Sequence, residues 1–197
     1  METRLWIEIF GVLTGIIYVI LEVRQNRLLW PLGILTSSVY IYVFFQGRFY
    51  ADMGLQVYYV LISVYGWYHW MRGKRPEGST ELPVSRLPIR LWPWLIVVFL
   101  ICWGGIWYVL HHFTDSEVPL GDAFTTALAI VATWMLTRKY LEQWHLWVVA
   151  NIVSVALYIY KGLYPTVVLY LVYAGMAVYG FLEWRKSMQN NEQSTAN

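Results

Sequence analysis

The chain has 197 residues, of which 58% are hydrophobic, 18% aromatic and only 13% charged. This composition lies outside the usual range of soluble domains and indicates an integral membrane protein. The net charge of +2 and the lack of a basic patch argue against nucleic-acid binding. The first residues show no secretory signal pattern, and a single cysteine cannot form an intrachain disulfide. We therefore expect one membrane domain with short loops.

Apolar runs follow one another along the chain, and each has close to the roughly 20 residues that a helix needs to cross a hydrocarbon core. The seven runs cover residues 5–22, 28–46, 52–71, 91–110, 119–136, 143–160 and 164–184. Proline and charge between residues 72 and 90 predict a linker, and the polar residues 187–197 predict a disordered tail. The pattern predicts an all-α protein with seven transmembrane helices.

The basic residues of the loops predict the orientation. Eleven of the fourteen Lys and Arg residues fall on the side that carries the C-terminus. Because cytoplasmic loops are enriched in Lys and Arg, we expect the N-terminus outside and the C-terminus in the cytoplasm.

The first and last thirds of the chain repeat one another at an offset of 114 residues, without a gap. The strongest matches are Trp30 with Trp144, Tyr59 with Tyr173, Gly66 with Gly180, and Trp70 with Trp184. Repeat one covers about residues 5–71 and repeat two about 119–184, with a linker helix at about 91–110. Two three-helix units separated by one helix enter the membrane in the same direction, a 3+1+3 arrangement typical of transporters with parallel repeats.

Two predicted spans carry a stripe that is both polar and aromatic. At 100° per residue, one face of span six holds Trp144, Trp147, Asn151, Ser154 and Tyr158. One face of span three holds Gln56, Tyr59, Ser63, Trp67 and Trp70. A carboxamide in hydrocarbon needs hydrogen-bond partners, so both faces are expected to point into the bundle and to line one cavity.

Simpler roles compete with ligand binding at these positions. Tryptophan near helix ends commonly forms an interfacial belt, and a lone Asn151 or Gln56 can join helices through hydrogen bonds. Glu8 and Asp122 lie near the outer ends of their spans, where they are either boundary groups or counter-ions for a cationic ligand.

The chemistry of the two stripes indicates a ligand class. Indole and phenol rings with amides, and no buried Lys or Arg, suit a flat heteroaromatic molecule, above all a cation held by cation-π attraction. We expect no metal, cofactor or catalytic residue. Span seven lacks the lysine of a retinal protein, mid-depth positions lack the groups of a membrane hydrolase, and no phosphate-binding loop or buried acid relay of a pump is present.

The segments GRFYADMGLQVYYVLISVYGWYHW, EQWHLWVVANIVSVALYIYKGLYP and YGFLEW resemble the PnuC family of bacterial vitamin transporters over about residues 8–186. The resemblance implies seven helices in a SWEET-like arrangement in the inner membrane. It also implies facilitated diffusion, with trapping of the vitamin by a cytoplasmic kinase, and self-association, as a trimer. The WxxWxxxN motif places Trp144, Trp147 and Asn151 at the binding site, with Gln56 and Tyr59 as partners.

The substrate that the resemblance implies is nicotinamide riboside, with thiamine as the alternative. Repeat one, in LEVRQNRLLWPLGILTSSVYIYVF, looks more like the thiamine-type PnuT members. Both vitamins are cationic heteroaromatics, so the pocket chemistry suits either. We assign nicotinamide riboside because the family at large carries it.

Overall fold

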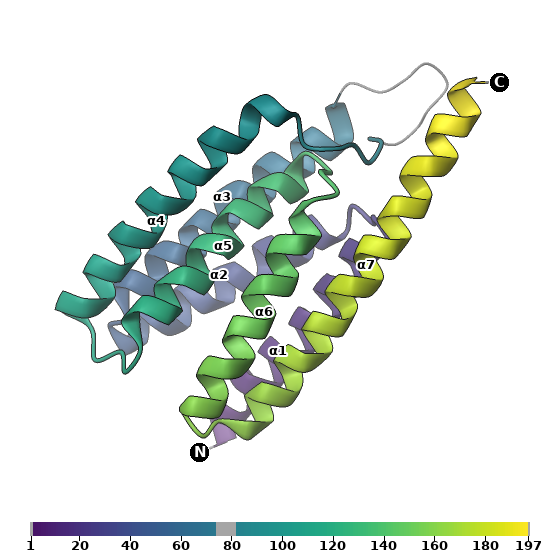
Figure 1. The fold of residues 1–197 in the computed structure, drawn as a ribbon. Coiled ribbons are helices and arrows are strands. Elements are labelled where there is room, and N and C mark those ends of the chain that lie inside the picture. The colour runs from purple at the N-terminus through teal and green to yellow at the C-terminus, as the bar shows by residue number, and fades with distance from the viewer. Residues whose placement is uncertain (1, 74–81, 197) are drawn as a thin grey trace. The chain divides into compact units, whose positions relative to one another are not determined.

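The computed structural model describes residues 2–73 and 82–196, and its described part is helical almost throughout (Figure 1). Its α-helices are α1 (Glu2–Val23), α2 (Leu29–Gly47), α3 (Tyr50–Arg72), α4 (Trp92–Phe113), α5 (Pro119–Thr137), α6 (Gln143–Tyr160) and α7 (Tyr164–Ala196). A 3-10 turn, η1 (Ile89–Leu91), precedes α4. The chain forms two compact units, Met1–Leu82 with α1 to α3 and Pro83–Asn197 with α4 to α7. Each unit is described separately below.

Each predicted apolar run is a helix in the structure, so the all-α fold class is confirmed. Among the described residues, five helical segments are long and apolar enough to cross a membrane: Leu29–Gly47, Ile89–Phe113, Pro119–Thr137, Gln143–Tyr160 and Tyr164–Asn191. The described apolar part of α1, Ile9–Val23, is shorter. Helix α3 is not in this group, because its tyrosines, Gln56 and His69 lower its hydropathy. This is expected of a helix whose polar face is turned away from lipid.

The polar tail differs from the prediction. We expected disorder from residue 187, whereas α7 continues through this segment to Ala196. The segment contains no Gly or Pro after Gly180, and Met, Gln, Glu and Lys are good helix formers. A helix already formed in the membrane adds residues without a second nucleation step, so polarity alone does not end it.

The turn after the first helix of each repeat shows the internal repeat in the backbone. Gln25, after α1, and Lys139, after α5, have φ values of 54° and 53° and are separated by the same 114 residues. In both turns the next N–H donates to the carbonyl five residues earlier, and the left-handed residue donates to the carbonyl three earlier. This is the Schellman pattern that closes helix C-termini.

The turn after the second helix repeats the same device. Arg48, after α2, and Gly162, after α6, have φ values of 60° and 70°. The hydrogen bonds that follow again match, with Phe49 N donating to Phe44 O at 2.9 Å and Leu163 N to Tyr158 O at 2.9 Å. Matching left-handed positions in unrelated residue types show that the repeat is a property of the backbone path and not of shared composition.

A tryptophan pair closes the contact between α2 and α3 in the first unit. Trp30 is fully buried, and its ring meets that of Trp70 edge-on at 5.4 Å with an interplanar angle of 90°. The Trp30 ring also lies against Gly66, where a Cβ would be 2.6 Å from the indole Cζ2. Glycine is therefore required for this close approach.

The second unit contains the same arrangement between α6 and α7. Trp144 meets Trp184 edge-on at 5.5 Å and 88°, and it lies against Gly180, where a Cβ would again be 2.6 Å from the indole Cζ2. The two Trp pairs and the Gly pair among the matches of the sequence repeat are thus one packing unit built twice. Edge-to-face ring pairs contribute about 0.5–1.5 kcal/mol beyond the area they bury.

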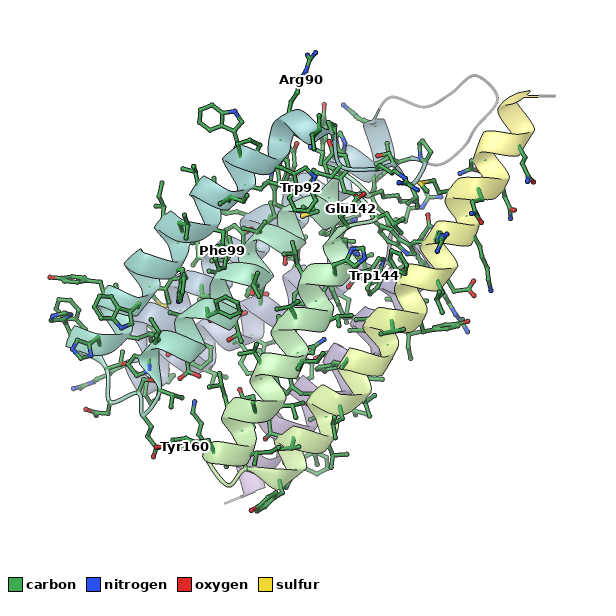
Figure 2. The ribbon with its side chains drawn as sticks, in the orientation of Figure 1. Arg90, Trp92, Phe99, Glu142, Trp144 and Tyr160 are labelled. Atoms are coloured by element: carbon green, nitrogen blue, oxygen red, sulfur yellow. The ribbon has the colours of Figure 1, made fainter. Side chains whose placement is uncertain are left out.

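The segment before α4 is fastened to the loop between α5 and α6. Ser85 N donates to Lys139 O at 3.1 Å, Leu141 N donates to Ser85 O at 2.9 Å, and Leu87 N donates to the Glu142 carboxylate at 2.8 Å. Glu142 lies at this end of α6 (Figure 2). These bonds hold the end of the linker segment within the second unit.

Candidate functional site

The predicted face of α6 points into the protein. Trp144, Asn151 and Ser154 are all at most 7% exposed, and Trp147 and Tyr158 are half-buried. On the opposite side Val149 and Ile152 are 45% and 57% exposed. Because a spanning helix turns its apolar side to lipid, the Trp, Asn and Ser stripe is the interior side, as its periodicity predicted.

Two indole donors on this face have no hydrogen-bond partner in the described part of the chain. The indole Nε1 atoms of Trp144 and Trp147 are buried, and neither has a hydrogen-bond partner among the described residues. In the same part of the chain no side-chain hydrogen bond is found for the Asn151 carboxamide. A buried amide that joined two helices would show its partner on the neighbouring helix. The face therefore has free hydrogen-bonding capacity, as a ligand site requires.

Trp144 and Trp147 differ in their surroundings. Trp144 is 1% exposed and enclosed by Gly180 and Trp184, so little of its ring is free to contact a ligand. Its equivalent in repeat one is the equally enclosed Trp30. Trp147 instead corresponds to Gly33 in repeat one, so its ring belongs to repeat two alone. Trp144 holds α6 on α7, and Trp147 has the freer ring.

Tyr158 lies at the C-terminal end of the same face, within a cluster of rings. Its ring is 5.0 Å from Tyr170 of α7, and Tyr170 is 5.8 Å from Tyr173. The Lys161 ammonium lies 5.6 Å from the Tyr158 centroid. This ammonium is held by Asp122, so the ion pair lies beside the Tyr158 ring.

The predicted residues of α3 belong to the first unit. Gln56 and Tyr59 are half-buried, and the Tyr59 ring packs on Tyr58 at 5.5 Å. Trp67 is 37% exposed, although it shares a helical arc with Trp70, which is 6% exposed. Trp70 is occupied by its contact with Trp30, so the predicted arc divides into a packing residue and an outward ring.

Asp122 has a partner that the sequence pattern did not reveal. Both of its carboxylate oxygens lie 2.9 Å from the Lys161 ammonium, and Ser116 Oγ donates to it at 2.8 Å. The pair joins the start of α5 to the end of α6. In the sequence, Lys161 is a charged residue of a short loop, 39 positions after Asp122, and nothing in the pattern indicates that the two residues pair. The side chain of Glu8, the second predicted counter-ion, lies outside the described residues.

We predict that Asp122→Asn lowers stability and leaves substrate affinity unchanged. Side chains 29% and 19% exposed are partly screened by solvent, so the ion pair is expected to contribute no more than about 1 kcal/mol. Thermal unfolding of Asp122→Asn, Lys161→Met and the double variant measures the coupling. A drop in ligand affinity in Asp122→Asn, with stability unchanged, would show instead that Asp122 acts on the ligand.

Metal chemistry finds no support in the described side chains, since no group of three or more His, Cys, Asp or Glu residues lies close enough there to hold an ion. The site consists of rings, amides and hydroxyls. Such groups bind and orient a molecule by stacking and hydrogen bonding.

Comparison with known proteins gives the family. The model of the nicotinamide mononucleotide transporter family matches residues 5–186, most of the chain. The chain belongs to this family. The nicotinamide riboside transporter PnuC of Escherichia coli (strain K12) is 27% identical over 92% of this chain and 86% of its own length. The PnuC transporter of Neisseria mucosa is 28% identical over 94% and 74%.

Two further comparisons add a relative named for a different vitamin and a solved structure. The riboflavin/roseoflavin transporter RibM of Streptomyces davaonensis is 24% identical over 91% of this chain and 84% of its own length. The crystal structure of the vitamin B3 transporter PnuC is 26% identical, has a TM-score of 0.72, and is matched over 94% of this chain and 83% of that chain. The chain is therefore a multi-pass membrane transporter, and it is not an enzyme.

Proposed function

We propose that this chain imports nicotinamide riboside by facilitated diffusion. The observation that carries the proposal is the buried face of α6, where the Trp147 indole and the buried Asn151 carboxamide lie one helical turn apart, and where the Trp147 Nε1 atom has no hydrogen-bond partner among the described residues. Relatives named as nicotinamide riboside transporters, 27% and 28% identical over more than nine tenths of this chain, support the same substrate.

The substrate's chemistry matches these groups. A pyridinium ring is a flat cation that an indole attracts with about 0.5–2 kcal/mol, and its carboxamide pairs naturally with the carboxamide of Asn151. We assign Trp147, Asn151 and Tyr158 to the ligand in repeat two, and Gln56, Tyr59 and Trp67 in repeat one. Trp144 is assigned a positioning role, since it fixes the turn of α6 from which Trp147 projects.

The direction of transport rests on the loop charges. With eleven of fourteen basic residues on the side of the C-terminus, we infer that this side is cytoplasmic and the N-terminus is outside. Facilitated diffusion only equalises concentrations, so net uptake requires removal of the free vitamin inside. Phosphorylation by a cytoplasmic kinase would achieve this, because the anionic product has no cationic partner among the assigned residues.

Two other vitamins are natural competitors in a test. Thiamine is the second candidate, because the repeat-one segment LEVRQNRLLWPLGILTSSVYIYVF resembles the thiamine-type members of the family. Riboflavin is a further competitor, because the relative RibM, which is 24% identical to this chain, is named as a riboflavin/roseoflavin transporter. Riboflavin is uncharged, so a site that works through cation-π attraction should bind it more weakly.

We predict that purified protein in liposomes equilibrates labelled nicotinamide riboside and that an uncoupler has no effect. The reason is that the sequence shows no series of acidic residues along the spans that could couple protons to transport. Enclosing a riboside kinase with ATP should convert equilibration into accumulation. Accumulation without the kinase that is lost with the uncoupler would contradict passive transport. Unlabelled thiamine and unlabelled nicotinamide riboside can each be added as competitors of the labelled riboside. If thiamine abolishes uptake at a lower concentration than the unlabelled riboside does, the substrate assignment is wrong.

A further inference from the structure

An apolar groove runs along α4 in the second unit, away from the indole and amide face of α6. Its volume is about 130 Å³ and no polar atom lines it. Trp92, Leu95, Ile96 and Phe99 of α4 form one wall, and side chains of α5 and α6 form the other. Figure 2 shows Trp92 and Phe99 on the side of α4 that faces α5.

The floor of the groove is firmly packed. Val131 and Met135 of α5 are at most 4% exposed and form a buried cluster with Leu87. Leu87 is itself held by the bond from its N–H to Glu142 at 2.8 Å. A groove with a fixed floor keeps its shape, so a ligand does not have to order it on binding.

The outer wall of the groove is exposed and apolar. None of the residues of α4 is buried, and Ile89–Phe113 has the highest mean hydropathy of the spanning segments, 2.0. From Trp92 to Phe99 the wall extends over about 10 Å along the helix, roughly a third of the depth of a hydrocarbon core. A hydrocarbon chain matches this length and the lack of polar surface in the groove.

Positive charge at one end of the groove indicates which kind of polar group a bound ligand would carry there. Arg86 and Arg90 flank Leu87 and the start of α4, both are exposed, and no ion pair is described for either. Arg90 projects beyond the start of the helix (Figure 2). Next to them Trp92 and Trp94 are 40% and 70% exposed, as indoles are at the level of lipid headgroups. Basic groups beside a groove between helices recognise anionic headgroups.

We propose that this groove binds an acyl chain of an anionic phospholipid, whose phosphate pairs with Arg86 and Arg90. The arginines supply the charge complement, and the apolar wall from Trp92 to Phe99 supplies the contact with the chain. The occupant is a bilayer lipid and not the transported vitamin, because a polar cation would find no hydrogen-bond partner in the groove.

Native mass spectrometry of the full chain tests this proposal, with phosphatidylglycerol and phosphatidylcholine of identical acyl chains as probes. We expect phosphatidylglycerol to be retained in preference. Arg86→Gln and Arg90→Gln should each reduce that preference about fivefold, the attraction of one basic residue near a charged lipid surface. Arg185→Gln, an exposed arginine on α7 that does not line the groove, is the matched control and should leave the preference unchanged.

A second pair of variants tests the groove itself. Ile96→Trp fills it from its exposed side and should reduce retention of both lipids, whereas Val97→Trp, one residue on and outside the lining, should not. Equal retention of the two lipids by the unaltered protein, or equal effects of the two Trp variants, would overturn the proposal. So would loss of an oligomer in Ile96→Trp without loss of lipid, which would mean that a second copy fills the groove. Binding of nicotinamide riboside to the same samples should be unchanged, so the outcome is independent of the proposed substrate.

Discussion

Gly180→Ala is expected to lower the stability of the protein by about 1–3 kcal/mol, the usual cost of forcing an extra methyl group into a packed site. The new Cβ would lie 2.6 Å from Cζ2 of Trp144, a rigid ring that Trp184 meets edge-on from another direction. Neither ring can move without separating α6 from α7. Thermal unfolding in detergent, followed by circular dichroism, measures the change.

The repeat provides a second test of the same contact. Gly66→Ala faces Trp30 at the same 2.6 Å and should have a similar effect in the first unit. Gly54→Ala and Gly175→Ala are matched controls on α3 and α7, where a Cβ would meet nothing within 4 Å. They should be neutral or slightly stabilising, because alanine is the better helix former.

Substrate binding should also respond to Gly180→Ala if Trp144 positions Trp147. A shifted α6 moves the Trp147 ring, so the folded fraction of Gly180→Ala should bind nicotinamide riboside more weakly, whereas Gly66→Ala should affect mainly stability. Affinity unchanged in Gly180→Ala, despite lower stability, would limit Trp144 to a packing role.

Asn151→Ala is expected to weaken binding of nicotinamide riboside by about 1–3 kcal/mol, or about 5- to 150-fold in Kd. The carboxamide has no side-chain partner among the described residues, so the substitution removes a ligand contact and leaves no protein group unpaired there. The melting temperature should therefore change little. Equilibrium binding of labelled substrate and thermal unfolding, measured on the same preparation, separate the two effects.

Thr133→Val provides the contrast for Asn151→Ala. Thr133 is also buried, at 4% exposure, but its hydroxyl donates to the Ala129 carbonyl of its own helix at 2.7 Å. Its replacement should leave affinity unaltered. If Asn151→Ala instead unfolds the protein while the folded remainder keeps its affinity, the amide joins helices and the proposed site must be reassigned.

The composition of the chain and its local periodicity predicted much of this fold. Hydropathy marked all seven helices, and the 114-residue offset found in the sequence also relates the left-handed residues of the inter-helix turns in the structure. The disordered tail was predicted wrongly, because polarity shows that a segment leaves the membrane but not that its helix ends.

The candidate site was predictable in part. A helical wheel depends only on spacing along one helix, so it correctly placed Trp144, Asn151 and Ser154 on a buried face. The wheel could not distinguish Trp144 from Trp147, because the difference lies in Gly180 on another helix. It likewise assigned Trp67 and Trp70 to one arc, although only Trp70 meets Trp30.

The sequence by itself thus determined the membrane class, the helices, the repeat and the interior face of α6, all of which follow from neighbouring residues and from regular spacing. Only the tertiary structure decided what each polar or aromatic side chain does. It paired Asp122 with Lys161, enclosed Trp144 against Gly180, and left the Trp147 Nε1 atom without a hydrogen-bond partner in the described part of the chain. The physical reason is that these contacts join residues far apart in the chain, and their distances are set by how helices pack.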